Sequence, residues 1–306
     1  MMSIAEMRLI VNPVAAGGAV GKRWPRIQRT LREEGLPFTA ALTEGTGHAT
    51  ELARQALAEG YRTIVALGGD GTINEVVNGL VIEGQIDPEV VLGIIPGGAG
   101  DDFRRTLGIP ADYRQACRRL MGHEARLIDL GEVEYTSEGG PGRRCFINFA
   151  GLGFDAAVVE RTRRSWKSLP GTIPYLMSLL VTIVTYQNKD MRILLDGEEL
   201  RQRANAVIVF NGRYCGGGMF IAPDADPSDG LFDIIVIGDT TKLEFLANVP
   251  KVYRGTHLTH PKVDAYRARE VRVEARQRMF LQGDGELIGE APVTFRVVPQ
   301  ALRIRV

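Results

Sequence analysis

A glycine-rich turn directly after a short apolar strand is the feature that most restricts the fold of this chain. Gly68-Gly69-Asp70-Gly71-Thr72 follows the β-branched run at 63–67 and opens a stretch with helical spacing. Glycine permits positive φ and close backbone approach, and a helix N-terminus offers N–H groups and a positive dipole end. The unit therefore predicts an anion-binding loop in an α/β domain, although a glycine pair alone also suits a plain tight turn.

The first part of the chain alternates between strand and helix patterns. Apolar runs predict strands at 8–11, 38–42, 63–67 and 90–95. Apolar residues at i, i+3, i+4 spacing predict helices at 46–58 and 113–121. This βαβ pattern predicts a mainly parallel sheet in a domain that covers residues 1–126.

Strand patterns dominate after residue 126. They predict strands at 128–135, 144–149, 191–195, 204–210, 231–237, 262–266, 271–274 and 293–298. Two helices are expected near 155–164 and 175–186, and Asp196-Gly197 is typical of a hairpin turn. We therefore expect a β-sandwich over 127–298, with 299–306 as a strand that could join the first domain.

Composition excludes several classes of protein. The chain has 306 residues, 37 Lys+Arg against 37 Asp+Glu, and three widely spaced cysteines. A balanced charge gives no net attraction to nucleic acid, and an odd cysteine count gives no disulfide framework. The longest apolar run, 173–186, is shorter than the roughly 20 residues of a spanning helix. Residues 1–6 carry neither a basic nor an apolar region, so we expect no secretion signal. We expect a cytoplasmic protein, with peripheral contact to a membrane as an option.

A basic, aromatic run precedes that apolar stretch. It consists of Arg161, Arg163, Arg164, Trp166 and Lys167. Such a run is commonly a solvated helix face, and the alternative is a contact with an anionic membrane surface.

Two more glycine-rich turns follow predicted strands, at 11–18 (VNPVAAGG) and 96–103 (PGGAGDDF). In an open parallel sheet such loops all emerge at the carboxyl edge, where ligands bind. A P-loop is excluded because Ala16 and Arg23 stand where Gly and Ser or Thr belong. A dinucleotide pattern at 151–156 lacks its acidic partner about 20 positions on, so we do not interpret it as a nucleotide site.

The glycine-rich turns belong to a longer series of segments. These are VNPVAAGG, TEGTGHATELA, GGDGTINEVVNGL, IPGGAGDDFRRTLGIP, NFAGLGFDA, PDADPSDGLFDIIVI and GDGE, in order from Asn12 to the C-terminus. The series resembles the diacylglycerol kinase catalytic-domain family of lipid kinases, which is related to sphingosine and ceramide kinases. The resemblance implies a three-layer α/β nucleotide-binding domain like that of NAD kinases, a C-terminal β-sandwich, and an ATP cleft between them.

The resemblance also implies roles for individual residues. The nucleotide would be lined by Asn12, Gly17, Thr43, Gly69, Asp70, Gly71, Thr72, Glu75, Gly97 and Gly98. Asp284 would be the general base, with Glu286 nearby and Asp70 in the catalytic set. A metal loop would use the Asp229 carboxylate and the carbonyls of Asp226 and Leu231. ATP and Mg²⁺ are the expected cofactors.

The expected activity is transfer of the γ-phosphate of ATP to diacylglycerol, at the inner face of the membrane, giving phosphatidic acid. A sphingoid base or a soluble alcohol stays an alternative acceptor, and a non-catalytic nucleotide-binding regulator is the alternative from another class. The oligomeric state stays open, with a homodimer as one option.

The third glycine turn departs from the family pattern GTxNDFAR. Here Ala99, Asp101 and Arg104 replace Thr, Asn and Ala. Asp101 beside Asp102 adds negative charge near the expected phosphates, which a metal or an amine would have to compensate. We expect this change to alter head-group preference or metal demand.

Overall fold

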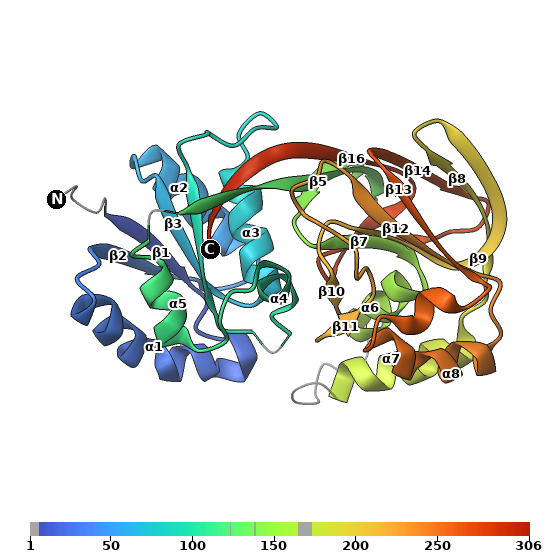
Figure 1. Cartoon of the computed structure of the whole chain (residues 1–306), viewed down its shortest axis with the longest axis horizontal. Coiled ribbons are helices and arrows are strands. Elements are labelled where there is room, and N and C mark those ends of the chain that lie inside the picture. Colours follow the sequence, from blue (N-terminus) through green and yellow to red (C-terminus); the bar gives the residue numbers. More distant parts are fainter. Residues whose placement is uncertain (1–5, 99, 123, 138, 165–172) are drawn as a thin grey trace. The chain divides into compact units, whose positions relative to one another are not determined.

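The structure is a computed structural model that describes residues 6–98, 100–122, 124–137, 139–164 and 173–306 (Figure 1). The chain forms two compact units. The N-terminal unit comprises Met1–Asp129 and Pro299–Val306, and the C-terminal unit comprises Leu130–Val298. Because the chain returns at its end, the last residues of strand β16 (Glu286–Arg305) belong to the N-terminal unit.

Parallel strand pairs form the sheet of the N-terminal unit. Strand β1 (Met7–Val11) pairs with β2 (Phe38–Leu42) and with β3 (Thr63–Gly68). Strand β4 (Val91–Pro96) pairs with β3 and with the end of β16. The carboxyl ends of β1, β3 and β4 therefore share one edge, and each leads into one of the glycine-rich turns.

Helices cover both faces of this sheet. They are α1 (Ala15–Glu33), α2 (His48–Ala58), α3 (Asp70–Leu80), α4 (Asp102–Leu107) and α5 (Tyr113–Arg119). Leu9 and Val65 are buried in one cluster with Trp24 and Leu31 of α1. Ile64 alternates with Val65 along β3 and is also buried, so it points to the opposite face, where α3 contacts β3.

The C-terminal unit is built from antiparallel strands. They are β5 (Ala125–Ser137, which begins in the N-terminal unit), β6 (Gly140–Phe146), β7 (Phe149–Gly153), β8 (Lys189–Leu195), β9 (Glu198–Phe210), β12 (Phe232–Gly238), β13 (Val263–Ala268), β14 (Glu270–Ala275), β15 (Phe280–Gly283) and β16, with a short pair β10 (Tyr214–Cys215) and β11 (Met219–Phe220). Pairs β16–β14, β14–β8, β8–β9, β9–β7, β7–β15 and β15–β16 close a circuit. Inside it Phe146 stacks on Phe232 with ring centroids 5.5 Å apart.

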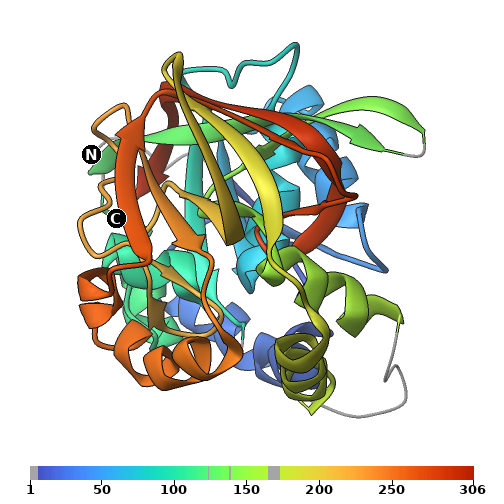
Figure 2. The ribbon, with the colours of Figure 1, turned by 90° about the vertical axis from the view of Figure 1, so that its right-hand side faces the viewer.

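Helices α6 (Phe154–Arg164), α7 (Ile173–Thr185) and α8 (Lys242–Val252) and the 3₁₀ turn η1 (Thr256–Thr259) complete this unit. Figure 2, in which the C-terminal unit faces the viewer, shows α7 and α8 gathered at one end of the strands. They share a buried cluster that includes Phe154, Ile183 and Ile235. None of the helices in the described residues is both long and apolar enough to cross a membrane.

Most predicted elements are present, and one is wrong in an informative way. The Asp196-Gly197 hairpin is confirmed, because Leu195 pairs with Glu198 and both turn residues have positive φ. The single strand predicted at 144–149 is broken, since β6 ends at Phe146 and β7 begins at Phe149. The backbone N–H groups at the break serve a distant carboxylate, described below.

Candidate active site

Three glycine-rich turns meet at the carboxyl edge of the N-terminal sheet. Asn12, after β1, donates a hydrogen bond from Nδ2 to Oγ1 of Thr72 at 2.9 Å. The N–H of Gly97, after β4, donates to the carbonyl of Gly68 at 2.9 Å. Residues far apart in the sequence are thus joined directly, as the predicted convergence of these loops requires.

Glycine is required where two of these turns touch. A Cβ on Gly69 would lie 2.9 Å from Cα of Gly98, and a Cβ on Gly98 would lie 2.6 Å from Cα of Gly69. Real Cβ atoms do not approach backbone this closely, so a larger residue would push the turns apart. At this contact the two turns pack backbone against backbone at the N-terminus of α3, whose first turn contains Gly71 and Thr72, and we call these turns the glycine cradle.

The remaining predicted nucleotide residues lie on the same edge but differ in their surroundings. Gly17 has φ +65, and none of the described atoms would lie within 4 Å of a Cβ added to it. Thr43 is buried, and its N–H donates to the carbonyl of Val11 at 2.8 Å. The carboxylate of Glu75 accepts from the N–H groups of Gly47 at 2.8 Å and Ala49 at 3.1 Å. Glu75 therefore ties the start of α2 to α3.

Asp70 performs a similar task for α4. Its carboxylate oxygens accept from the N–H groups of Asp102 at 2.9 Å and Phe103 at 3.1 Å. Burial raises the pKa of Asp70 above its ordinary value, and these hydrogen bonds oppose the shift. The acid within the second turn thus fixes the third turn.

The two acids of the third turn, Asp101 and Asp102, each lie beside an arginine. Oδ1 of Asp101 accepts from the N–H of Gly98 at 2.8 Å, and burial raises the pKa of Asp101 to about 6. Nε of Arg104 lies 4.0 Å from the Asp101 carboxylate, while Arg105 pairs with Asp102 at 2.7 Å. Two of the three departures from the family pattern, Asp101 and Arg104, therefore lie within ion-pair distance of each other, and the third, Ala99, lies outside the described residues.

In the C-terminal unit, Asp284 occupies the turn between β15 and β16. It is buried with a positive φ of 48°. Its carboxylate accepts from the N–H groups of Ile147 at 2.8 Å, Asn148 at 3.0 Å and Phe149 at 3.0 Å. These donors explain why the predicted strand 144–149 breaks, because N–H groups that hold a carboxylate are not available to a strand ladder.

Glu286 stands two residues further on and has a different environment. It pairs with Arg144 through Oε2 and Nη2 at 2.6 Å and is partly exposed. The salt bridge fixes it on β16 beside β6. The structure thus gives Glu286 a partner of opposite charge, whereas a set of backbone N–H groups orients Asp284.

The acidic loop at 224–233 contains the predicted metal residues. Oδ1 of Asp226 accepts from Ser228, and Oδ1 of Asp229 accepts from the N–H of Leu231 at 3.0 Å. Arg267 forms an ion pair with Asp229 and lies 3.8 Å from Asp233. Within the described ranges no three His, Cys, Asp or Glu side chains gather as a metal site. Arg267 and Arg213 both supply positive charge at this loop.

Sequence reasoning missed a buried pair behind the Asp284 turn. Gln282 donates from Nε2 to Oδ2 of Asp155 at 2.9 Å, and its Oε1 accepts from the N–H of Gly285 at 2.9 Å. Asp155 belongs to the pattern at 151–156 that resembles a dinucleotide motif. A Cβ on Gly151 would lie 1.9 Å from Oδ2 of Asp155, a close approach that the local sequence does not indicate.

The fold and these residues define a two-unit protein with a glycine cradle in an α/β unit and an oriented carboxylate in a β-rich unit. Residues 6–133 match the family model described as the diacylglycerol kinase catalytic domain. Residues 148–306 match the model described as the YegS C-terminal NAD kinase beta sandwich-like domain.

Curated relatives and solved structures agree with these matches. "Diacylglycerol kinase" of Bacillus subtilis (strain 168) is 30% identical over 289 residues, covering 94% of this chain and 92% of the relative. "Diacylglycerol kinase" of Staphylococcus saprophyticus is 31% identical over 298 residues, covering 97% and 94%. A solved structure from Bacillus anthracis str. Sterne, provisionally named as a diacylglycerol kinase, is 27% identical with a TM-score of 0.78, covering 100% and 98%. The chain belongs to the diacylglycerol kinase family.

Proposed function

We propose that this chain is an ATP-dependent lipid kinase that transfers the γ-phosphate of ATP to a hydroxyl of diacylglycerol, giving phosphatidic acid and ADP. The curated relatives named diacylglycerol kinase match nearly the whole chain. The observation that carries the proposal is the Asp284 carboxylate, which three backbone N–H groups hold in one orientation. A protein that only binds nucleotide has no use for such a group.

Phosphoryl transfer needs little covalent help from a protein. It needs the γ-phosphate in place, its charge neutralised, and one carboxylate within reach of the attacking hydroxyl. In the proposed step Asp284 takes the proton of the lipid hydroxyl, that oxygen bonds to the γ-phosphorus, and the bond from the γ-phosphorus to the bridging oxygen breaks. ADP leaves with the electron pair of that bond.

The N-terminal unit would hold the nucleotide. Its support is the backbone cradle that the Gly69–Gly98 contact creates at the start of α3. Asn12, Gly17, Thr43, Gly71, Thr72 and Gly97 lie on the same edge of the sheet and are proposed to surround the phosphates. Glu75 and Asp70 would act indirectly here, because their carboxylates already accept backbone N–H groups.

Mg²⁺ is proposed to accompany ATP at this cradle. Carboxylate oxygens are ligands that Mg²⁺ prefers, and the Asp101 carboxylate stands at a turn that would meet the phosphates. When bound, the ion would neutralise charge that develops on the phosphoryl oxygens. A second, structural metal at Asp226, Asp229 and Leu231 would have to displace Arg267 from Asp229.

We infer that the chain works in the cytoplasm at the inner face of the membrane, where its lipid substrate resides. The basic run before α7 gives limited support. Arg161 donates to Oγ1 of Thr182 and of Thr185 at 3.1 Å, and Arg164 pairs with Glu160. Trp166 and Lys167 lie outside the described residues. Contact with lipid is better argued from α7 and α8, as set out below, and nucleic acid is not proposed as a partner.

The test is transfer of labelled γ-phosphate from ATP into a panel of lipids and soluble alcohols in detergent micelles. Labelled phosphatidic acid that is lost in Asp284→Asn and kept in Glu290→Gln supports the proposal. Glu290 is a partly exposed carboxylate on β16, the strand that follows the Asp284 turn. Label in a sphingoid base or a soluble alcohol instead would show that this alcohol, and not diacylglycerol, accepts the phosphate. ATP binding without transfer to any alcohol would reduce the chain to a nucleotide-binding regulator.

A further inference from the structure

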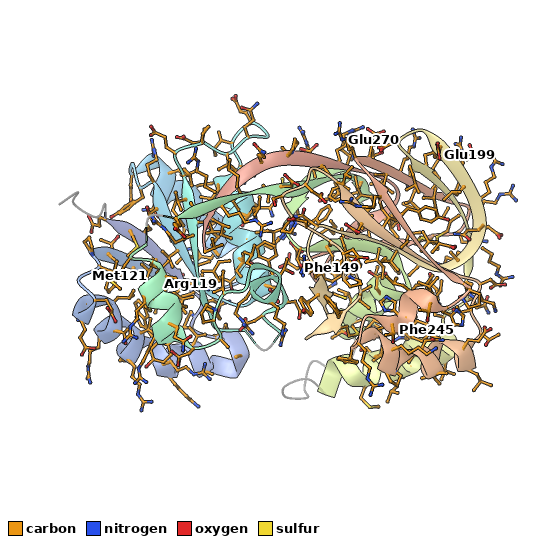
Figure 3. All side chains as sticks on the ribbon, in the orientation of Figure 1. Arg119, Met121, Phe149, Glu199, Phe245 and Glu270 are labelled. Carbon is orange, nitrogen blue, oxygen red and sulfur yellow. The ribbon has the colours of Figure 1, made fainter. Side chains whose placement is uncertain are left out.

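The C-terminal unit contains a pocket of about 210 Å³ between helices α6, α7 and α8 and strand β9. Its apolar side is aromatic. Phe154 lies 4.7 Å from Phe245 and 5.9 Å from Tyr186, measured between ring centroids. Phe245, labelled in Figure 3, belongs to α8. The pocket is separate from the Asp284 turn, whose residues do not line it.

The polar side of the pocket is basic. Arg203 and Lys242 line it, and among the described residues no carboxylate does. Nζ of Lys189 lies 5.4 Å from the ring centroid of Tyr186. Asp239 stands next to the lining, where it lies 3.6 Å from Arg203 and accepts from Asn188 at 2.8 Å. The lining itself therefore favours a ligand with negative charge.

Several polar atoms of the lining lack a hydrogen-bond partner in the described part of the chain. They are Oη of Tyr186, Oδ1 of Asn205 and Oγ1 of Thr240, all buried. Asn205 is 7% exposed and Thr240 is 9% exposed. Buried polar groups are nearly always satisfied in folded proteins, so this lining suits a ligand that brings oxygen and hydroxyl groups of its own.

Exposed apolar side chains surround this pocket. Five of the nine large hydrophobic side chains that are exposed in the described residues lie on or next to α7 and α8, namely Leu180, Val184, Leu243, Leu246 and Tyr253. Leu243 is 79% exposed, and no residue of α8 is fully buried. Nζ of Lys242 donates to the carbonyl of Val184, which joins the two helices. Apolar side chains with adjacent lysines are typical of helices that lie in a lipid interface.

We propose that this pocket binds the head group of an anionic phospholipid, while the exposed leucines of α7 and α8 enter the lipid layer. Arg203 and Lys242 would meet the phosphate, and the unpartnered Tyr186 and Thr240 hydroxyls would meet head-group oxygens. The proposal rests on the proposed function in one respect only: a lipid kinase has to reach a lipid surface. It assigns a docking lipid that is distinct from the phosphorylated substrate.

Vesicle sedimentation without ATP tests this proposal. We expect the protein to partition onto vesicles with about a third phosphatidylglycerol far better than onto phosphatidylcholine alone. Because each basic residue near an anionic surface contributes about fivefold, the pair Arg203→Gln and Lys242→Gln should lower that partitioning about 25-fold. Leu243→Gln with Leu246→Gln should lower binding to both vesicle types. Leu42→Gln, an exposed leucine on β2, is the matched control.

Soluble glycerophosphate distinguishes binding in the pocket from attraction by general surface charge. If the pocket binds the head group, glycerophosphate should inhibit vesicle binding of the native chain. Kinase activity of every variant in detergent micelles shows that the fold and active site are intact. Equal partitioning onto neutral and anionic vesicles would overturn the proposal. So would anionic binding that survives the loss of both cations. If micellar activity is absent in the native chain but vesicle binding behaves as expected, the kinase proposal fails alone.

A second inference concerns the buried pair of Asp155 and Gln282. Asp155, in the first turn of α6, is partly buried, and burial of its carboxylate raises the pKa of Asp155 to about 6. Gly151 is needed for this, because any Cβ at that position would collide with the Asp155 carboxylate. Gln282 links Asp155 to the Asp284 turn. It donates a hydrogen bond to Asp155 and accepts one from the N–H of Gly285, the neighbour of Asp284.

We infer that Asp155 is a positioning residue, which acts through Gln282 to hold the Gly285 N–H and thereby the left-handed turn of Asp284. The NFAGLGFDA segment then has a role in catalysis without touching nucleotide. Asp284 at φ 48° is in a conformation that non-glycine residues adopt only when their surroundings enforce it. This inference rests on the proposed role of Asp284.

A swap of the hydrogen-bond polarity tests the pair. Gln282→Glu still offers an acceptor to Gly285 but sets two carboxylates against each other. We expect kcat to fall about tenfold to a hundredfold, as for a small misplacement of a reacting group, with the KM for ATP unchanged. Adding Asp155→Asn supplies an amide donor to the introduced carboxylate and should restore kcat to within about threefold.

Three results would overturn the inference. One is native kcat in Gln282→Glu, another is a double variant no better than the single one, and the third is a parallel rise in the KM for ATP. Asp284→Asn is assayed beside them. If Asp284→Asn keeps full activity, the proposed base is wrong, whatever the pair does.

Discussion

The two sets of candidate functional residues, one in each unit, position their groups in opposite ways. In the N-terminal unit, side-chain carboxylates hold the backbone: Asp70 binds N–H groups at the start of α4, and Glu75 binds N–H groups at the start of α2. In the C-terminal unit, the backbone holds a side chain, because three consecutive N–H groups bind Asp284. The first arrangement shapes a cradle of backbone groups, and the second presents a single acid.

This difference predicts how each half responds to substitution. A cradle made by backbone tolerates the loss of one side chain but not a change in loop spacing. An oriented acid tolerates neutral neighbours but not the loss of its charge.

The largest effect is expected from Asp284→Asn. The amide keeps the size of the side chain but cannot take a proton from the lipid hydroxyl, and its NH₂ group faces backbone donors. Loss of a general base costs about 10²–10⁴-fold in rate, so kcat should fall by that factor while the KM for ATP stays constant. Steady-state kinetics in micelles measure both. Activity within tenfold of the native chain would mean that another group is the base.

Gly98→Ala should produce the next largest effect, and it acts on spacing instead of charge. The new Cβ would meet Cα of Gly69 at 2.6 Å and Oδ1 of Asp101 at 2.5 Å. We expect about 1–3 kcal/mol of destabilisation from this overpacking and a clear rise in the KM for ATP. Thermal unfolding and kinetics report the two effects.

Gly45→Ala is the control for that experiment. Gly45 lies in the same unit, with none of the described atoms within 4 Å of an added Cβ and no positive φ. It should behave as the native chain. If Gly98→Ala were equally silent, the close contact of the two turns would not matter for nucleotide binding.

The local parts of this site were predictable from sequence, and the long-range parts were not. Glycine turns after β-branched strands identify the loops after β1, β3 and β4, since the signal lies within a few neighbouring residues. The break between β6 and β7 was not predictable, because its cause is Asp284, which is 137 positions from Ile147. For the same reason Asp155 could not be connected with Gln282.

Two longer helices were also missed, each for a physical reason. Helix α1 starts with Ala16, Gly17 and Gly18 at positive φ and contains Pro25, all of which argue against a helix locally. Helix α8 contains Pro250 and has no fully buried residue, since Phe245 and Val252 are only partly buried where they pack against a core cluster. Leu243 and Leu246 are exposed instead, and these are the side chains that we propose to enter a lipid layer.

Asp101→Asn tests the pH dependence of the third turn. The pKa of Asp101 is raised from 3.8 to about 6 in the folded chain, mainly by burial. Between these values the folded state keeps a proton that the unfolded chain has lost, so the free energy of unfolding falls as pH rises through this window. An asparagine at this position still accepts the hydrogen bond from Gly98 but does not titrate. Asp101→Asn should therefore abolish this decrease in the free energy of unfolding, which is on the order of 1–3 kcal/mol.

Thermal unfolding of both chains at low and neutral pH measures this difference. The native chain should lose stability relative to Asp101→Asn as pH rises from about 4 to about 6. An identical pH slope in the two chains would show that Arg104 fully offsets the buried charge. The same pair of proteins, assayed against Mg²⁺ concentration and a lipid panel, also tests whether Asp101 alters metal demand or head-group preference.

The smallest effect is expected at the acidic loop, where Arg267→Gln distinguishes an arginine from a metal as the counter-charge. Arg267 pairs with Asp229 and lies near Asp233, whose pKa burial raises to about 6. Because Arg267 already pairs with Asp229, chelation of divalent ions should leave the thermal unfolding of the native chain unchanged. Loss of this partly exposed pair should itself change the free energy of unfolding by only about 0–1 kcal/mol. In Arg267→Gln the Asp229 carboxylate loses its ion-pair partner, and added Mg²⁺ or Ca²⁺ should then raise the unfolding temperature. A native chain that loses stability on chelation would show instead that a metal displaces Arg267 from Asp229.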